Sequence, residues 1–234
     1  MQKYKIADLV FEINTIYANS HKFLAPYAYD GDKSAQFVLT TCEQDILDEQ
    51  QKADSQYPLP YLENLALFRK FCFKALELAE ALIFHCSAVA VDGEAYLFTA
   101  PSGTGKSTHT RLWRELLGEK AVMINDDKPM IRFIDGHFYV YGTPWNGKHK
   151  LGENTRAKIK AMCKLERAEH NKIEKCSNQE MLLTVLNQTV MPSDECSMDR
   201  LLKIIEKLFD QVGLYKLGCN MQIDAAKLAY EAMK

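Results

Sequence analysis

Residues 95–108, AYLFTAPSGTGKST, place an apolar segment typical of a strand directly before a loop in which two glycines lead into a lysine and two hydroxyl side chains. The order matches the phosphate-loop pattern GxxxxGK[ST], except that Ala100 stands where the first glycine is usual. Such a loop needs a strand before it and a helix after it, and residues 107–117 have the pattern of a helix. We therefore interpret the stretch as a phosphate loop in an α/β protein; the alternative is a chance glycine turn before a helix.

The residue types in this loop suit a bound polyphosphate. Gly103 and Gly105 can adopt positive φ and turn backbone N–H groups inward, while the helix that follows offers free N–H groups and the positive end of its dipole. Lys106 can reach the outer phosphates, and the Ser107 hydroxyl can ligate Mg²⁺. The residues expected to hold the nucleotide are Ser102, Gly103, Thr104, Gly105, Lys106, Ser107 and Thr108.

A bound magnesium nucleotide requires a second anchor, usually a carboxylate at the end of a neighbouring strand. Asp126 and Asp127 follow the apolar residues 121–124, which have the pattern of a buried strand. Two adjacent carboxylates allow one to bind the metal while the other accepts a proton from an attacking hydroxyl. A polar turn with a capping aspartate is the alternative interpretation.

A third candidate element is the loop GTPWNGKHK at residues 142–150. Its glycines, proline and basic side chains suit a loop that lies over a nucleotide and places a cation against the charge that grows during phosphoryl transfer. We assign that cation to Lys148. Trp145 either stacks on a base or anchors the loop to the core. Arg156 and Arg167 are further basic candidates that no spacing argument supports.

Composition restricts the class of protein. The chain has 234 residues, 47% of them hydrophobic, and a net charge of −2, so no overall basic field favours nucleic acid or an anionic membrane. Seven cysteines without a CxxC pair indicate thiols of a reducing compartment rather than a disulfide framework. The N-terminus lacks the pattern of a signal peptide, and the apolar runs are too short to cross a bilayer. We expect a cytoplasmic protein.

Periodicity predicts the surrounding elements. Alternating stretches at 4–13 and 36–41 indicate a small β-rich lobe over residues 1–58, followed by the phosphate-loop domain over 59–234. Two Asp-Gly dipeptides, at 92–93 and 135–136, predict hairpins, which a purely parallel sheet would lack. We expect a mixed sheet with a further strand at 158–167 and helices at 61–84, 179–190, 198–210 and 223–233.

The order of His85, PSGTGKST at 101–108 and the Asp126–Asp127 pair resembles the catalytic domain of HPr kinase/phosphorylase, whose phosphate loop reads GxSGxGKS. The chain resembles most the HPr-kinase-related proteins of bacteria, and more distantly ATP-dependent phosphoenolpyruvate carboxykinase. The resemblance spans about residues 83–150 and implies that α/β phosphate-loop fold, with ATP and Mg²⁺ as cofactors. By the same resemblance Asp126 would be the general base, Asp127 its companion near the metal, and His85 a residue that points toward the transferring phosphate.

The expected activity is therefore that of an ATP- and Mg²⁺-dependent kinase whose acceptor is a hydroxyl, foremost the serine of a peptide or small protein. A small-molecule kinase and a non-catalytic, nucleotide-dependent binding module are the alternatives. The signature segment that handles HPr and dephosphorylation in HPr kinase has no counterpart in this sequence, so the resemblance does not extend to HPr as acceptor or to the reverse reaction. HPr kinases form rings, and a homo-oligomer is compatible with this chain, although the sequence marks no interface.

Overall fold

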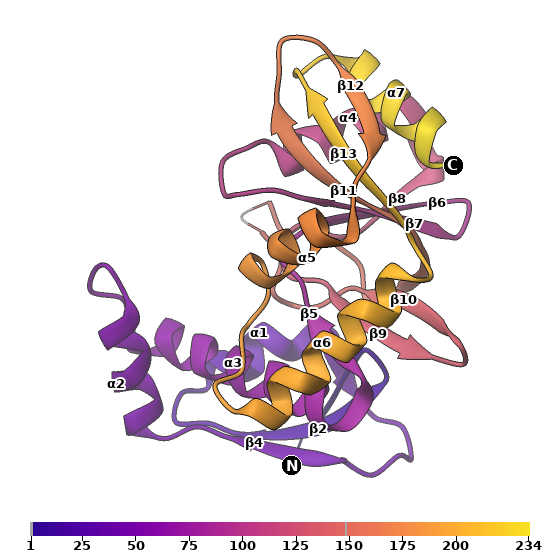
Figure 1. The fold of residues 1–234 in the computed structure, drawn as a ribbon. Coiled ribbons are helices and arrows are strands. Elements are labelled where there is room, and N and C mark those ends of the chain that lie inside the picture. Colours follow the sequence, from indigo (N-terminus) through magenta and orange to yellow (C-terminus); the bar gives the residue numbers. More distant parts are fainter. Residues whose placement is uncertain (1, 148) are drawn as a thin grey trace.

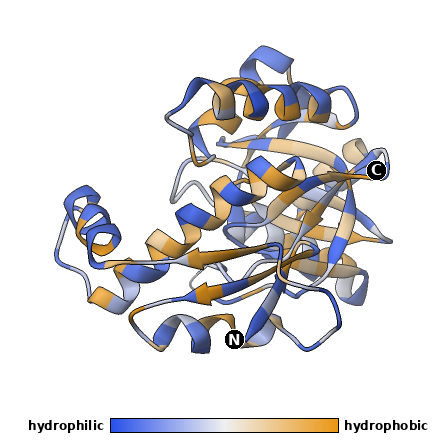
Figure 2. Cartoon of the chain, turned by 90° about the horizontal axis from the view of Figure 1, so that it is seen from below, coloured by the Kyte–Doolittle hydropathy of each residue, from blue (hydrophilic) through white to orange (hydrophobic). Residues whose placement is uncertain are grey.

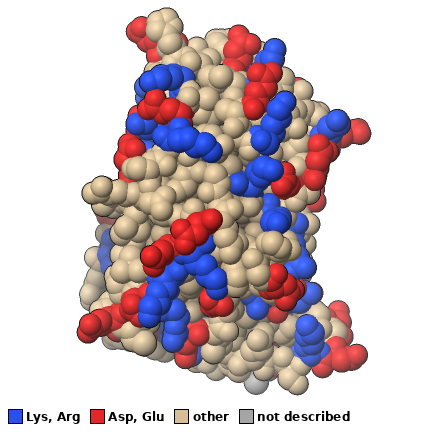
Figure 3. All heavy atoms as spheres, turned by 45° about the vertical axis from the view of Figure 1, so that its right-hand side comes forward, with Lys and Arg blue, Asp and Glu red and all other residues tan. Residues whose placement is uncertain are grey.

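The computed structural model describes residues 2–147 and 149–234 of a mixed α/β protein. Two sheets organise it (Figure 1): a four-stranded sheet in the N-terminal part and a nine-stranded sheet built from the rest of the chain. On the face that Figure 3 displays, basic and acidic side chains are interspersed. Among the helices of the described ranges, none combines the length and the apolar character that a bilayer crossing requires.

The small sheet has the order β3-β1-β2-β4. The β-rich stretch predicted at 4–13 forms a hairpin, because Ala7 and Asp8 adopt positive φ (50° and 61°) and turn the chain back on itself. The strands are β1 (Lys3–Ile6), β2 (Leu9–Asn14), β3 (Ala28–Tyr29) and β4 (Phe37–Thr40). The elements that the sequence did not predict here are α1 (Asn19–Leu24), the 3-10 turn η1 (Ala25–Tyr27) and α2 (Glu43–Lys52).

The long helix α3 (Leu59–Ala79) ends five residues before the predicted end of the helix at 61–84. Glu80 adopts the left-handed conformation (φ 44°, ψ 49°) that ends the helix. The next residues form β5 (Ala81–Ile83), where Ile83 pairs with Met130. Ile83 continues the helical spacing of apolar residues, so spacing alone placed the helix end too late.

The large sheet has the order β5-β9-β10-β11-β7-β6-β8, and β13 and β12 extend it from β11. Both Asp-Gly hairpins are confirmed: one joins β6 (Ser87–Val91) to β7 (Glu94–Thr99), the other joins β9 (Met130–Ile134) to β10 (His137–Tyr141). The pairings of β11 with β7 and with β13 are parallel, which makes the sheet mixed as predicted. The remaining strands are β8 (Ala121–Asn125), β11 (Arg156–Arg167), β12 (Lys172–Lys175) and β13 (Gly213–Cys219).

Helices cover the large sheet, and their positions confirm four predictions. They are α4 (Lys106–Leu117), followed by the short η2 (Gly118–Lys120), and then α5 (Asn178–Asn187), α6 (Glu195–Phe209) and α7 (Ile223–Met233). In Figure 1 α4 and α7 lie side by side at the end of the molecule opposite the small sheet, and they also contact one another. Hydrophobic residues follow the strands, as the colouring in Figure 2 shows.

One hydrophobic core joins the small sheet to the rest of the molecule. Tyr4 and Phe11 of the small sheet, Phe71 of α3, and Met130 and Tyr141 of the large sheet belong to the same buried cluster. The helix α3 thus packs on both sheets at once. The division into a lobe over residues 1–58 and a domain over 59–234 stays a prediction.

Candidate active site

The loop between β7 and α4 has the backbone that a phosphate loop needs. Gly103 and Gly105 adopt φ values of +77° and +123°, and a Cβ at either position would meet nothing within 4 Å, so conformation rather than crowding favours glycine there. The helix α4 begins at Lys106. Because the first N–H groups of a helix lack partners within it, this end of α4 offers hydrogen-bond donors to an anion.

Ala100 explains how the loop tolerates the missing first glycine. Its side chain is fully buried in a cluster with Phe98 and Leu112, and its φ is not positive. Position 100 therefore ends the strand with a small apolar side chain, and its backbone does not require glycine.

Lys106 is held close to the loop. Its Nζ donates to the carbonyl oxygen of Ala100 at 2.9 Å, and only 8% of the residue is exposed. Burial removes this ammonium from much of its hydration and thereby lowers the pKa of Lys106. The carbonyl oxygen of Ala100 is neutral and offers Lys106 only a dipole. An anion bound in the loop would give this ammonium a full negative charge as its partner.

The carboxylate of Asp126 lies buried at the end of β8. Ser87 Oγ donates to Asp126 Oδ1 at 2.8 Å, and a Cβ built on Gly147 would lie 3.6 Å from Asp126 Oδ2. The neighbouring Asn125 fixes the turn, because its Oδ1 accepts from the backbone N–H groups of Asp127 (2.8 Å) and Lys128 (2.9 Å). One oxygen of Asp126 is thus held by a hydroxyl, and the other faces the loop around Gly147.

Asp127 pairs with a histidine. His85 Nε2 lies 3.0 Å from Asp127 Oδ1, and Lys128 Nζ lies 3.5 Å from the same oxygen. Burial raises the pKa of Asp127, but the hydrogen bond from His85 and the charge of Lys128 outweigh it, so the pKa of this carboxyl lies below its usual value. Asp127 is therefore anionic at neutral pH.

Ser87 is a site residue that the sequence analysis missed. His85 and Ser87 lie on either side of a bend at Cys86, just before and at the start of β6, and they contact the adjacent carboxylates Asp127 and Asp126. The contact between Ser87 and Asp126 joins residues 39 positions apart, so no local pattern in the sequence marks Ser87 as a site residue.

A single cavity of about 530 Å³ gathers most of the predicted site. It brings the phosphate loop to face both aspartates, together with His85. Of the predicted residues, Thr104 does not line this cavity, and Lys148 lies outside the described residues. The lining comprises His85, Ser102, Gly103, Gly105, Lys106, Ser107, Thr108, Asp126, Asp127, Gly147 and His149.

The donor set of this cavity suits a hard cation. Its candidate ligands are the Ser107 hydroxyl and the carboxylate of Asp127, which are oxygen donors of the kind Mg²⁺ prefers. Among the described residues, no three His, Cys, Asp or Glu side chains converge on one point as a metal cage. In nucleotide sites Mg²⁺ usually has a few protein oxygens as ligands, and phosphate and water oxygens complete its coordination.

A second cavity of about 440 Å³ adjoins the first on the other side of β7. The two share Gly103, Gly105 and Thr108 in their linings. Leu112 and Leu165 give the second cavity apolar walls, and its rim carries polar groups. At that rim Arg167 donates to the carbonyl oxygen of Gly103 at 2.6 Å, a contact between residues 64 positions apart.

Trp145 anchors its loop to the core, which is one of its two predicted roles. Its ring centroid lies 5.0 Å from that of Phe68, 5.4 Å from that of Phe71 and 6.2 Å from that of Phe23. The backbone oxygen of Trp145 accepts from the N–H of Lys128 at 3.2 Å. The loop beside Asp126 and Asp127 is thus tied both to the N-terminal core and to the aspartate turn.

Replacement of Trp145 by alanine is expected to lower the free energy of unfolding by about 3 kcal/mol, because it removes a large aromatic side chain from a packed cluster. Urea denaturation measures the change. Trp145→Phe is the control and should lose about half as much, since it keeps an aromatic ring. An unchanged urea midpoint in Trp145→Ala would show that the ring does not hold the loop.

The fold defines the class of this chain as a mixed α/β protein. No protein-family model matches the sequence, and no curated protein matches it. Among solved structures 47 chains match. One of them is the Hpr(Ser) kinase/phosphatase from Coxiella burnetii, with 11% sequence identity and a TM-score of 0.30 over 55% of this chain and 94% of that chain. A similarity of this size assigns neither a family nor an activity.

Proposed function

We propose that this protein is an ATP- and Mg²⁺-dependent phosphotransferase of the phosphoenolpyruvate carboxykinase/HPr kinase type, and that it transfers the γ-phosphoryl group to a hydroxyl, the serine of a peptide or small protein. One observation carries the proposal: the glycine loop at 103–107 and the carboxylates of Asp126 and Asp127 line the same cavity. Phosphoryl transfer needs this combination of a phosphate cradle, a metal anchor and a proton acceptor.

The nucleotide would span both cavities. Its phosphates would lie against the backbone N–H groups of the loop and the start of α4, where Lys106 supplies a positive charge. Its nucleoside would occupy the second cavity, because the shared residues Gly103, Gly105 and Thr108 make that cavity the direct continuation of the phosphate site. The apolar walls formed by Leu112 and Leu165 suit the faces of a base.

Ser107 and Asp127 would hold Mg²⁺, which when bound neutralises phosphate charge and fixes the geometry of the phosphates. His85 and Lys128 keep Asp127 ionised through the contacts described above. In this arrangement His85 acts on the metal anchor and orients it. Its predicted direct contact with the transferring phosphate remains a proposal.

Asp126 would act as the general base. It accepts the proton of the acceptor hydroxyl while that oxygen bonds to the γ-phosphorus and the bond from the γ-phosphorus to the β,γ-bridging oxygen breaks, which releases ADP. The hydrogen bond from Ser87 holds one carboxylate oxygen, so the oxygen that faces Gly147 is the proton acceptor. Lys106 and Lys148 would stabilise the charge that spreads over the phosphoryl oxygens.

The test is transfer of label from γ-labelled ATP in the presence of Mg²⁺ to a mixture of serine peptides, together with calorimetric titration of ATP. We expect labelled peptide and ADP in equal amounts, and no transfer when EDTA removes the metal. Tight ATP binding without turnover on any peptide, small hydroxyl compound or protein extract would identify a nucleotide-dependent binding module instead. Absence of ATP binding would refute the proposal altogether.

A further inference from the structure

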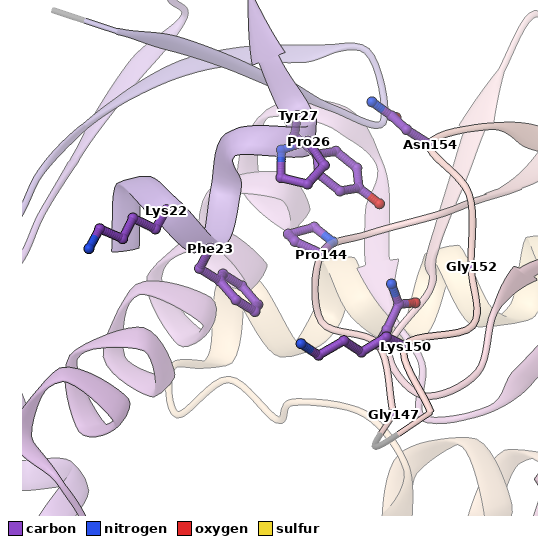
Figure 4. A pocket seen from close by; sticks show the side chains of 10 residues that line it. Lys22, Phe23, Pro26, Tyr27, Pro144, Gly147, Lys150, Gly152 and Asn154 are labelled. Carbon is purple, nitrogen blue, oxygen red and sulfur yellow. The ribbon is translucent and has the colours of Figure 1, made fainter. Parts of the chain in front are cut away.

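A third cavity, of about 590 Å³, lies between the N-terminal part and the loop that follows β10 (Figure 4). One wall comes from α1 and η1, through Lys22, Phe23, Pro26 and Tyr27. The opposite wall comes from the 144–154 loop, in which Pro144 faces the η1 residues and Lys150 extends toward Phe23. The cavity is distinct from both cavities that border the phosphate loop.

This third cavity and the active-site cavity share one lining residue, Gly147. A Cβ at this glycine would lie 3.6 Å from Asp126 Oδ2, the oxygen to which we assign proton transfer. A molecule that occupies the third cavity and passes Gly147 would therefore bring its next group to the general base. Gly147 itself places no side chain between the two cavities.

Both walls of the cavity are fixed in place. Trp145, between the lining residues Pro144 and Asn146, packs on Phe68 and Phe71. The chain that leads into α1 is held by the buried carboxyl of Glu63 on α3, which accepts from the backbone N–H groups of Ile16 (2.6 Å) and Tyr17 (3.1 Å). A preformed site of this kind binds without first having to order its walls.

The chemistry of the lining selects the ligand. The described lining residues include Lys22 and Lys150 and no Asp or Glu, so the site favours negative charge. Phe23, Pro26 and Pro144 add apolar surface that suits an apolar or aromatic side chain. A ligand that fills this cavity and also reaches Asp126 extends through two cavities, which a peptide does and a compact metabolite does not.

We propose that this cavity binds the phosphoacceptor, and that it selects a peptide segment with acidic residues and an aromatic residue beside the target serine. The proposal rests on the proposed function, because it identifies the acceptor of that reaction. It assigns the N-terminal part of the chain a role in substrate choice. Lys150 would pair with a carboxylate next to the serine, and Lys22, at the rim, would pair with a second one further along the peptide.

Peptide binding can be tested without catalysis. Two fluorescein-labelled peptides of equal length, each with a central serine and one phenylalanine, carry either glutamates or lysines at the flanking positions. Fluorescence anisotropy at low salt, with no nucleotide present, gives their dissociation constants. We expect the acidic peptide to bind at least about tenfold more tightly than the basic one, and the difference to shrink as salt is added.

The charge-reversal variant Lys22→Glu/Lys150→Glu should lose this preference. Both lysines are exposed, so the variant is expected to fold, and Lys227→Glu, an exposed lysine on α7, is the matched control that should keep the preference. If the double variant does not fold, Asn154→Asp adds one negative charge to the same lining and should weaken the acidic peptide alone.

Three outcomes would overturn the proposal: equal affinity of the wild-type protein for the two peptides, a preference that survives in the double variant, or displacement by free glutamate at the same concentration as by the peptide. The last would indicate a small anionic acceptor. Failure of the proposed function would look different, because ATP binding and transfer would be lost while the peptide preference in the anisotropy assay remained.

Discussion

Asp126→Asn is expected to lower the rate of phosphoryl transfer to a serine peptide by about 10²–10⁴-fold, the range that a positioned general base contributes. Asparagine nearly matches aspartate in shape, and its amide oxygen can still accept the hydrogen bond from Ser87 Oγ. What the variant lacks is a group that takes up the proton of the acceptor. Its dissociation constant for MgATP, measured by calorimetry, should therefore stay within about twofold of the wild-type value, which is within 0.4 kcal/mol.

Asp199→Asn is the control for this substitution. Asp199 is an exposed carboxylate on α6 that pairs with Lys203, so its neutralisation should leave transfer unchanged. If Asp126→Asn transfers phosphate at the wild-type rate, Asp126 is not the base. If Asp127→Asn alone abolishes transfer while ATP affinity persists, the roles of the two carboxylates are exchanged.

Lys106→Met is expected to weaken MgATP binding by at least about 100-fold, because in the proposed site it removes the cation that would pair with the outer phosphates. The same substitution should raise the free energy of unfolding in the absence of nucleotide by about 1 kcal/mol. The reason is that Lys106 is nearly buried and, among the described residues, its ammonium hydrogen-bonds to the Ala100 carbonyl oxygen alone, whereas methionine fills the space without a charge. Calorimetry measures the first effect and urea denaturation the second.

The pH dependence of stability gives an independent check on Lys106. Burial lowers the pKa of Lys106 in the folded protein below its ordinary value of 10.5, so the unfolded chain binds this proton more tightly than the folded protein does. Wild-type stability should therefore gain a contribution as pH rises toward that value, and Lys106→Met should lack it. Lys120→Met, at an exposed lysine, is the control. If the free energy of unfolding of Lys106→Met equals or falls below that of the wild type, burial of the Lys106 ammonium does not destabilise the folded protein.

Local signals predicted the elements that surround the phosphate loop. The Asp-Gly dipeptides marked both hairpins, since Asp92 and Gly93, like the second pair, adopt the positive φ values that such turns require. Periodicity located α4, α6 and α7 to within a few residues. These elements are determined by residues close together in the chain.

Elements that depend on distant partners were missed. The strand β13, GLYKLGC, holds two glycines and a lysine, and it is a strand because it pairs with β11 on one side and with β12 on the other. The helix α1 has six residues and lacks a side-chain cap, so it carries no start signal. The helix predicted at 61–84 extends too far for the same reason. Its last residues form β5, which is a strand because it pairs with the distant strand β9.

The candidate site divides in the same way. The glycine spacing predicted the loop, and the apolar strand pattern at 121–124 predicted the aspartate pair that follows it; the structure places both around one cavity. The contacts that orient them were out of reach, because Ser87 meets Asp126 across 39 residues and Arg167 meets Gly103 across 64. From the sequence, Trp145 could either stack on a base or anchor its loop to the core. Its contacts with Phe68 and Phe71 in the structure decide for the anchor.

The core that Tyr4 and Phe11 share with Phe71, Met130 and Tyr141 has a consequence for how this chain can change over generations. Recombination that exchanged the first 58 codons would expose the apolar face of α3 to water, unless the new N-terminal segment covered the same side chains. If the third cavity binds the acceptor as proposed, substrate choice is therefore easier to change by point substitutions at the exposed residues Lys22 or Pro26 than by exchange of whole gene segments.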